Sequence, residues 1–373
     1  MTVAAVVAPP FRPLFRPAAA LPGKAGRGLA ATGAPVAAAL AASLAAALLV
    51  LGTGLAHAQP AQQPAIVSVP EAEAQALLAR IQDAASKLDY SGIFTYQQGE
   101  TIQSSRVVHV VDGSGERERI EVLDGQPREY LRRNDDIQCL VPEHKTILIQ
   151  HKRAEQFPGL LLGSPAALTK YYRVLMQPTP HRVAGRECRI ITIEPLDKDR
   201  YGYRLCADTE NDLLLKAQTL SSASNVLEQV AFTALRLGPA VDHAQLESHW
   251  NTKDWKVLQG SMTPLDLAAQ GWRIPYPPGF NPVSQVGRTM AHGDPVSQLV
   301  LSDGLAAISV FIEPYDKKRN RHQPHGAYRR GPVNVYGMRI ADFWVTVLGE
   351  VPAATLEQLA KATEYVPPAA PPK

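Results

Sequence analysis

The residues best suited to chemistry are few and scattered along the chain. His322 and His325 are three positions apart, but Pro324 between them prevents a regular helix that would bring both rings to one metal ion. No third or fourth ligand accompanies them, so the pair favours a solvated loop over a zinc site. The sequence also contains no phosphate-binding loop, no serine-hydrolase elbow and no zinc-protease motif.

Paired carboxylates occur at Asp135-Asp136 and at Asp197 with Asp199, where they could act as a general acid and base. Both pairs sit in turn-like sequence, and aspartate is common in turns because its side chain bonds the local backbone. We therefore expect turns there, and a protein that is not an enzyme and holds no cofactor or metal. The alternative is an exported hydrolase. Loss of turnover on some substrate after changing one Asp, Ser or His would support that alternative.

Three cysteines remain. Cys188 and Cys206 flank two strand-like runs that are separated by the turn sequence around Asp197. A hairpin centred near residue 197 places them opposite one another, and facing Cα atoms ~4.5–5.5 Å apart are within disulfide reach. This predicts a disulfide, with two free buried thiols as the alternative, and Cys139 is expected to be a buried small hydrophobe.

The N-terminus has the pattern of an export signal. Within residues 1–58 the charged residues are Arg12, Arg16, Lys24 and Arg27, all before an uncharged Ala- and Leu-rich run that ends in Ala56-His-Ala58. This predicts a signal peptide cleaved before Gln59, with an uncleaved membrane anchor as the rival. The chain from residue 59 onward is close to neutral, which argues against nucleic-acid binding.

The exported part divides into two predicted domains. Their boundaries are expected at 59–67 (disordered), 68–237 (first domain), 238–262 (linker), 263–362 (second domain) and 363–373 (disordered tail). Ser68-Val-Pro-Glu71 reads as a capping box before a helix whose apolar face includes Leu77, Leu78 and Ile81. Short strands separated by turns then predict a curling antiparallel sheet. These strands are expected at 91–97, 106–112, 119–123, 129–133, 137–141, 146–150, 172–177, 188–194, 201–207, 213–221 and 226–237.

The segment 157–168 is apolar, is interrupted by prolines and glycines, and is long for a connection. It is either a short core helix with its loop or a flap over a hydrophobic cavity. In the second domain, strands are expected at 285–290, 297–302, 307–313, 333–340 and 343–347, with a helix at 353–362. The basic run 317–321, with Arg329 and Arg330, is either an exposed hairpin loop or a contact for an acidic partner or lipid phosphates.

Several segments resemble one family, the periplasmic sigma-E regulators called RseB or MucB. In the first domain these are Leu88–Tyr96, Tyr201–Leu205 and Leu213–Lys216. In the second they are Asp303-Gly-Leu-Ala, Ser309–Glu313, Asn334-Val-Tyr-Gly337 and Val345–Pro352. They occur in family order over roughly residues 71–362, although Cys206 stands where many members have Trp.

The resemblance implies an α+β protein. Its first domain would be an antiparallel half-barrel like LolA and LolB, with helices on the concave face. Its second would be a smaller sheet with a C-terminal helix. The family binds the periplasmic part of an RseA- or MucA-type anti-sigma factor, blocks its site-1 cleavage, and is thought to be released by lipopolysaccharide or lipid A. A LolA-type lipid or lipoprotein carrier is the alternative, and the sequence leaves open whether the protein forms a homo-oligomer.

Two sets of residues are expected to carry this function. The hydrophobic cavity would be lined by Phe94, Tyr96, Val108, Val110, Ile147, Ile149, Leu160, Leu161 and Leu162. The partner would contact the second domain through Lys317, Lys318, Arg319, Arg321, Arg329, Arg330, Tyr336 and Arg339. Period-2 alternation cannot tell which face of each strand is the inner one.

Overall fold

The structure is a computed structural model of the 373-residue chain. It describes residues 66–151, 157–159, 163–259, 262–289, 295–320, 323–330 and 333–368. The expected signal peptide 1–58, the segment Leu160–Leu162 and the last five residues lie outside the described residues. Every described residue belongs to one compact unit, Pro64–Lys373.

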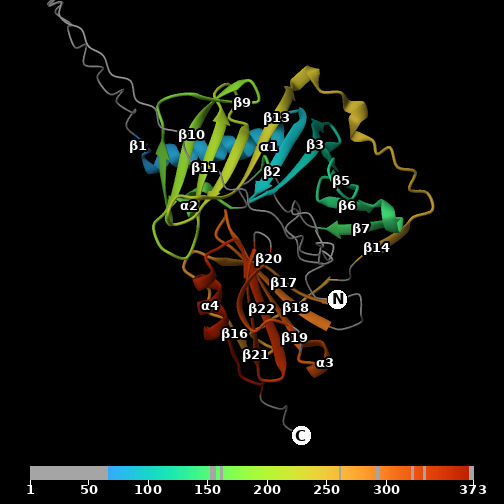
Figure 1. The fold of residues 1–373 in the computed structure, drawn as a ribbon, viewed down its shortest axis with the longest axis vertical. Coiled ribbons are helices and arrows are strands. Elements are labelled where there is room, and N and C mark those ends of the chain that lie inside the picture. The colour runs from blue at the N-terminus through green and yellow to red at the C-terminus, as the bar shows by residue number, and fades with distance from the viewer. Residues whose placement is uncertain are drawn as a thin grey trace, which may run out of the picture. The chain divides into compact units, whose positions relative to one another are not determined.

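The first sheet contains strands β1 to β14, from residue 67 to residue 259 (Figure 1). Its strands are hydrogen-bonded in the order β1-β8-β10-β11-β12-β13-β2-β3-β4-β5-β6-β7-β14, and β9 pairs with β10. All its pairs are antiparallel except β7–β14, which is parallel. The bounds are β1 Val67–Ser68, β2 Tyr90–Gln98, β3 Thr101–Asp112, β4 Gly115–Val122, β5 Arg128–Arg133, β6 Asp136–Val141, β7 Thr146–His151, β8 Tyr172–Met176, β9 His181–Val183, β10 Arg186–Pro195, β11 Gly202–Asp208, β12 Leu214–Leu220, β13 Val226–Leu237 and β14 Lys256–Gln259.

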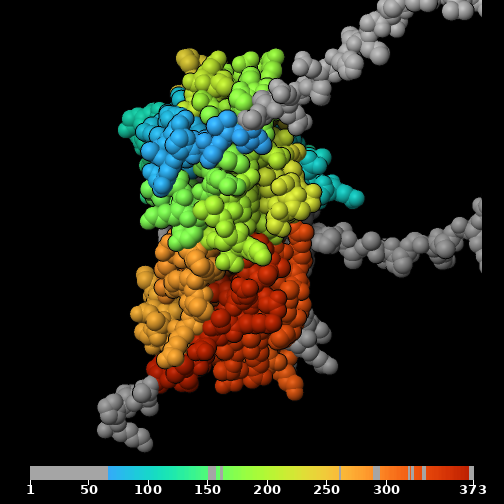
Figure 2. Space-filling model, turned by 90° about the vertical axis from the view of Figure 1, so that its left-hand side faces the viewer, coloured from blue at the N-terminus to red at the C-terminus, as the bar shows by residue number. Residues whose placement is uncertain are grey.

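Helix α1, Glu71–Lys87, lies across the strands of this sheet (Figure 1). The apolar face predicted from its periodicity is buried, while one side of the helix is at the molecular surface (Figure 2). The predicted capping box is wrong. Ser68 belongs to β1, and the helix starts after Pro70 without a side-chain cap, because that proline fixes the extended backbone that precedes the first turn. Val67, placed in a disordered segment by the sequence, is in β1 as well.

The second sheet has the order β15-β17-β18-β19-β22-β21-β20, and β16 pairs with β23 beside it. Its core is formed by alternate residues of the central strands and by α4, whose Leu356 and Leu359 are buried there. The bounds are β15 Met262–Pro264, β16 Trp272–Arg273, β17 Asn281–Thr289, β18 Pro295–Ser302, β19 Ala307–Pro314, β20 Gly326–Arg330, β21 Val333–Ile340, β22 Phe343–Gly349, α4 Ala353–Ala362 and β23 Glu364–Tyr365.

Short helices complete the fold. They are η2 Pro142–His144, α2 Pro165–Leu168, η3 Gly238–Ala240, η4 His243–Leu246 and α3 Lys317–Asn320. The predicted α+β class is therefore confirmed: a large antiparallel sheet with a helix across it, and a smaller sheet with a C-terminal helix.

Candidate functional site

The predicted cavity residues of β2 and β3 lie on opposite faces of the first sheet. Facing residues of an antiparallel pair share a face, and side chains alternate along each strand. Phe94 faces Ser105, whereas Val108 faces Ser91. Ser91 is three positions from Phe94 on β2, and an odd number of positions along a strand leads to the opposite face. Phe94 and Tyr96 are thus on one face, and Val108 and Val110 are on the other.

The face of Phe94 is the one that α1 covers. Tyr90, four residues before Phe94 and so on the same face, donates a hydrogen bond from its hydroxyl to the Ala85 carbonyl oxygen of α1 at 3.3 Å. Its ring stacks on His109 with centroids 4.5 Å apart. We call this the helix side of the sheet.

Three phenylalanines meet on the helix side. The ring centroids of Phe94 and Phe157 are 5.6 Å apart, those of Phe157 and Phe232 are 5.0 Å apart, and those of Phe94 and Phe232 are 6.2 Å apart. Phe157 is only 5% exposed although it comes from the predicted flap segment rather than from the sheet. This phenylalanine cluster means that the chain's own side chain occupies the place where we expected an apolar ligand.

The opposite face is covered by the segment that follows β13. Val241 and Leu246, from the predicted linker, form one buried cluster with Val108 and Val110. The linker is therefore docked over this part of the sheet, which we call the linker side.

Ile147 and Ile149 of β7 also belong to the linker side. They face Leu140 and Gln138 of β6, and the pairing continues without a shift through β5 and β4 to Val108. Both isoleucines are half-buried. The six described wall residues therefore divide into two on the helix side and four on the linker side.

A charged cluster fixes the linker on its side of the sheet. The Arg119 guanidinium is 2.8 Å from the Glu129 carboxylate, and both residues are buried. Arg119 also donates to the Gln245 carbonyl oxygen at 3.1 Å and to His249 Nδ1 at 3.2 Å. The guanidinium thus joins the sheet to the linker.

The same place brings together Glu121, Glu129 and His249, whose ligand atoms lie within 4.8 Å of one another. Arg119 stands among them and already supplies the positive charge that a metal ion would bring. The residues present therefore suit an ion-pair network better than a metal centre.

The predicted disulfide is confirmed. Cys188 and Cys206 are bonded, with Cα atoms 5.4 Å apart. They are offset in the ladder, because Cys206 faces Ile190 and Cys188 faces Asp208. Cys139 is free and buried, as expected.

The predicted partner residues of the second sheet are placed differently from one another. Lys317, Arg329 and Arg339 are exposed, and the Arg339 guanidinium lies over the Tyr315 ring at 4.1 Å from its centroid. Tyr336 is 6% exposed and belongs to the core, so its ring is not part of the surface. Arg321 and the side chains of Lys318, Arg319 and Arg330 lie outside what the structure describes.

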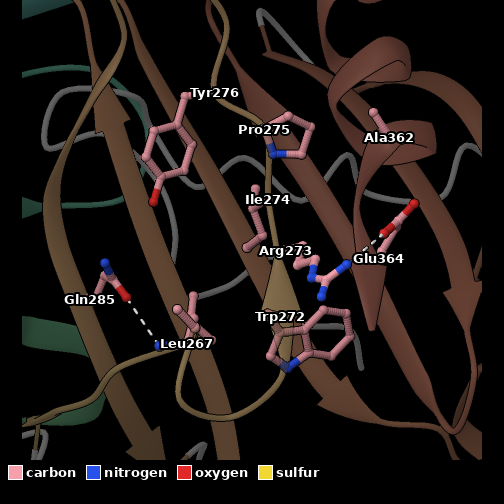
Figure 3. Close-up of a pocket in the computed structure, with 10 residues that line it drawn as sticks. Leu267, Trp272, Arg273, Ile274, Pro275, Tyr276, Gln285, Ala362 and Glu364 are labelled. Carbon is pink, nitrogen blue, oxygen red and sulfur yellow. Dashed lines mark hydrogen bonds and ion pairs between the residues drawn. The ribbon is translucent and has the colours of Figure 1, made fainter. Parts of the chain in front are cut away.

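The second sheet also carries an open pocket that the sequence did not reveal (Figure 3). Its volume is about 600 Å³, and its apolar lining includes Trp272, Ile274, Tyr276 and Leu267. Arg273 and Glu364 lie together at its rim, 4.0 Å apart. In the sequence, only the aromatic and proline residues of Gly271–Gly279 could have indicated this pocket. The pairing of β16 with β23 then brings Arg273 next to Glu364, which the sequence does not indicate.

Within the described part of the chain, no helix is both long and apolar enough to cross a bilayer. The architecture defines a class of two-sheet proteins, in which a large open antiparallel sheet carrying a helix is followed by a smaller sheet backed by a C-terminal helix. The sequence matches the MucB/RseB N-terminal domain over residues 73–250 and the MucB/RseB C-terminal domain over residues 266–364. The chain belongs to the MucB/RseB family.

Curated relatives support this assignment. The sigma factor AlgU regulatory protein MucB of Pseudomonas aeruginosa is 31% identical over 311 residues, which is 79% of this chain and 92% of that protein. The sigma-E factor regulatory protein RseB of Escherichia coli K12 is 24% identical over 303 residues, covering 78% of this chain and 90% of that protein.

Solved structures agree. The crystal structure of MucB in complex with MucA(peri) covers 80% of this chain and 100% of the MucB chain, with 29% identity and a TM-score of 0.61. The crystal structure of MucB alone covers 79% of this chain and 98% of that chain, with 28% identity and a TM-score of 0.56.

Proposed function

We propose that this chain is a negative regulator of an envelope stress response that binds the periplasmic part of a MucA- or RseA-type anti-sigma factor. By binding, it shields that protein from its first, site-1 cleavage. The observation that carries the proposal is the likeness to MucB in complex with MucA(peri), which extends over 80% of this chain at a TM-score of 0.61. Nearly all of the P. aeruginosa relative is spanned, so both sheets are included.

This role requires the chain to act in the periplasm. We propose export through the signal segment 1–58 with cleavage after Ala58. The Cys188–Cys206 disulfide supports this, since such bonds form and persist in oxidising compartments such as the periplasm.

We further propose that lipopolysaccharide, through the acyl chains of its lipid A, releases the partner. An acyl chain would enter at the phenylalanine cluster on the helix side, in the place of the Phe157 ring. Burial of each CH₂ contributes about 0.8 kcal/mol, so a chain of several carbons can offset the cost of moving the Phe157 ring. Release follows only if lipid binds the partner-free form more tightly than the bound form.

Two described surfaces of the second sheet are proposed to contact the partner. The first is the pocket that Tyr276 lines, because this residue is 41% exposed and aromatic side chains at a pocket are typical anchors of protein interfaces. The second is the edge strand β20, where the exposed Arg329 would meet acidic residues of the partner and speed association. Lys317 and Arg339 are separate candidates. Arg329 faces Asn334, which is five residues before Arg339, so the two arginines lie on opposite faces of the sheet.

Calorimetric titration of the full exported chain with the periplasmic segment of a MucA-type anti-sigma factor tests this proposal. Tight binding is expected, and it should weaken in Tyr276→Ala and in Arg329→Glu, the latter with a smaller dependence on salt. Arg182→Glu is the matched control, because it makes the same charge change on an exposed residue of β9. Lack of binding by the wild-type chain would contradict the function, and equal losses in Arg329→Glu and Arg182→Glu would reject the partner contact at Arg329.

A further inference from the structure

Arg200 is a charged residue whose side chain is fully buried, and it lies where the two sheets meet. It belongs to the turn between β10 and β11 of the first sheet. Its Nη1 donates to Asp303 Oδ2 at 2.9 Å, and both side chains are 0% exposed. Its Nη2 donates to the Pro278 carbonyl oxygen, and its Nε donates to Asp197 Oδ1 at 3.0 Å. One guanidinium therefore joins its own turn to two separate loops of the second sheet.

Aromatic rings enclose this guanidinium. Its central carbon is 4.8 Å from the ring centroid of Tyr171, 5.5 Å from that of Tyr172 and 5.1 Å from that of Phe280. Cation–π attraction at such distances is strongest where water is excluded, as it is here. The rings come from both sheets, so the cage exists only while the sheets are joined.

Asp303 is equally well satisfied. Its carboxylate accepts hydrogen bonds from the Tyr172 hydroxyl at 2.7 Å and from the backbone N–H groups of Leu305 and Ala306 at 2.9 and 2.8 Å. The same carboxylate thus fixes the turn between β18 and β19 and accepts hydrogen bonds from Tyr172 and Arg200 of the first sheet.

The backbones approach closely around this pair. A Cβ atom on Gly279 would come within 2.6 Å of the Tyr171 ring. Gly304 has φ +103°, and a Cβ atom on it would lie 3.0 Å from the Leu168 side chain of α2. Glycine is required where a side chain has no room and where φ is positive. We call Arg200, Asp303, Asp197 and the rings of Tyr171, Tyr172 and Phe280 the inter-sheet cluster.

A buried ion pair of this kind adds little net stability compared with apolar residues of the same size, but removal of one partner leaves an uncompensated buried charge. The contact is therefore either complete or open to water. We propose that the inter-sheet cluster holds the two sheets in the arrangement that binds the anti-sigma factor, and that opening of the cluster is the step by which the partner is lost. Arg200 and Asp303 are then positioning residues for partner binding, and this inference rests on the function proposed above.

We assign the formed cluster to the binding-competent state, because Arg200 fixes Asp303 and Pro278 of the second sheet to one turn of the first. When only a fraction of molecules is competent, the apparent affinity falls by that fraction.

The experiment uses the full exported chain with spin labels at Asp83→Cys on α1 and Gln358→Cys on α4, both exposed positions. Asp303→Asn removes one charge of the pair and should broaden the distance between the labels and lower affinity for the MucA-type segment by about tenfold or more. Glu194→Gln, which breaks the exposed Arg173–Glu194 pair, is the control and should change neither quantity. Replacing both partners, with Arg200→Met and Asp303→Leu, should restore both, because the apolar pair leaves no buried charge.

Each outcome decides between the alternatives. If a folded Asp303→Asn chain keeps the wild-type distances, or if its distances broaden while its affinity stays unchanged, the inference is overturned. Should Asp303→Asn fail to fold, Tyr172→Phe takes its place, since it removes a hydrogen bond to Asp303 without changing charge. A wild-type chain that binds no partner would refute the proposed function, and in that case unchanged distances in the variants would independently overturn the role of the cluster.

Discussion

The rings of Phe157 and Phe232 lie 5.0 Å apart, although one comes from the segment after β7 and the other from β13. Phe157 is nearly as buried as the sheet residues that it contacts. The Phe157 side chain is thus part of the core, and a lipid that binds here must take the place of its ring.

Phe157→Ala should separate these two roles. Truncating a buried phenylalanine costs roughly 3–5 kcal/mol of the free energy of unfolding, so the midpoint of urea unfolding should fall. Affinity for lipid A should rise, because the acyl chain no longer has to displace the ring. Phe157→Leu, which keeps most of the volume, should lie between wild type and Phe157→Ala on both measures. Weaker lipid binding by folded Phe157→Ala would contradict the proposed lipid site.

The Cys188–Cys206 disulfide should stabilise the first sheet. The bond closes a loop with a sequence separation of 18, for which chain-entropy arguments give about 3 kcal/mol. Urea unfolding of the oxidised and reduced chain measures this difference directly. The double variant Cys188→Ser, Cys206→Ser should resemble the reduced chain and should no longer respond to reductant. A continued response would assign the effect to another thiol.

Burial raises the pKa of the Cys139 thiol to about 11. The thiol is therefore protonated and unreactive near pH 8, and iodoacetamide should label the native chain very slowly but label Cys139 rapidly in urea. The pKa of this thiol in the folded chain lies above its pKa in the unfolded chain. The protonated thiol therefore contributes stability at pH values below about 8.5, and this contribution is lost as the pH rises towards 11. Cys139→Ala should flatten that part of the pH profile. Rapid labelling of the native chain would show that the thiol is accessible.

Docking of the linker should depend on Leu246. A charge at this buried position cannot pack against Val108 and Val110, so Leu246→Asp should release residues 241–249 from the sheet. Limited proteolysis should then cut this segment faster, while the exposed control Glu247→Gln should leave the rate unchanged. Equal rates in all three proteins would contradict a role of Leu246 in docking the linker.

Local signals were sufficient for many elements. The bounds of β13, β21 and α4 follow from alternation, periodicity and flanking turns, and they agree with the sequence prediction. The disulfide was predictable because it joins two neighbouring strands. The helix start at Glu71 was misjudged since Pro70, rather than a side-chain cap at Ser68, sets it.

Long-range features could not be predicted. Alternation identifies two faces of a strand without saying which one α1 covers, so Val108 and Phe94 were assigned to a single wall. The Arg200–Asp303 pair joins residues 103 positions apart, and nothing in the turn around Arg200 marks it as buried. Such contacts depend on how sheets meet, which a single sequence does not specify.

The central claim is that this chain protects an anti-sigma factor and yields it to a lipid signal. The most direct measurement is the rate at which a site-1 protease cuts the periplasmic segment of a MucA-type protein, with the purified chain present and with lipid A added afterwards. The account predicts that the chain slows cleavage and that lipid A restores it. Cleavage at the same rate with and without the chain would contradict it.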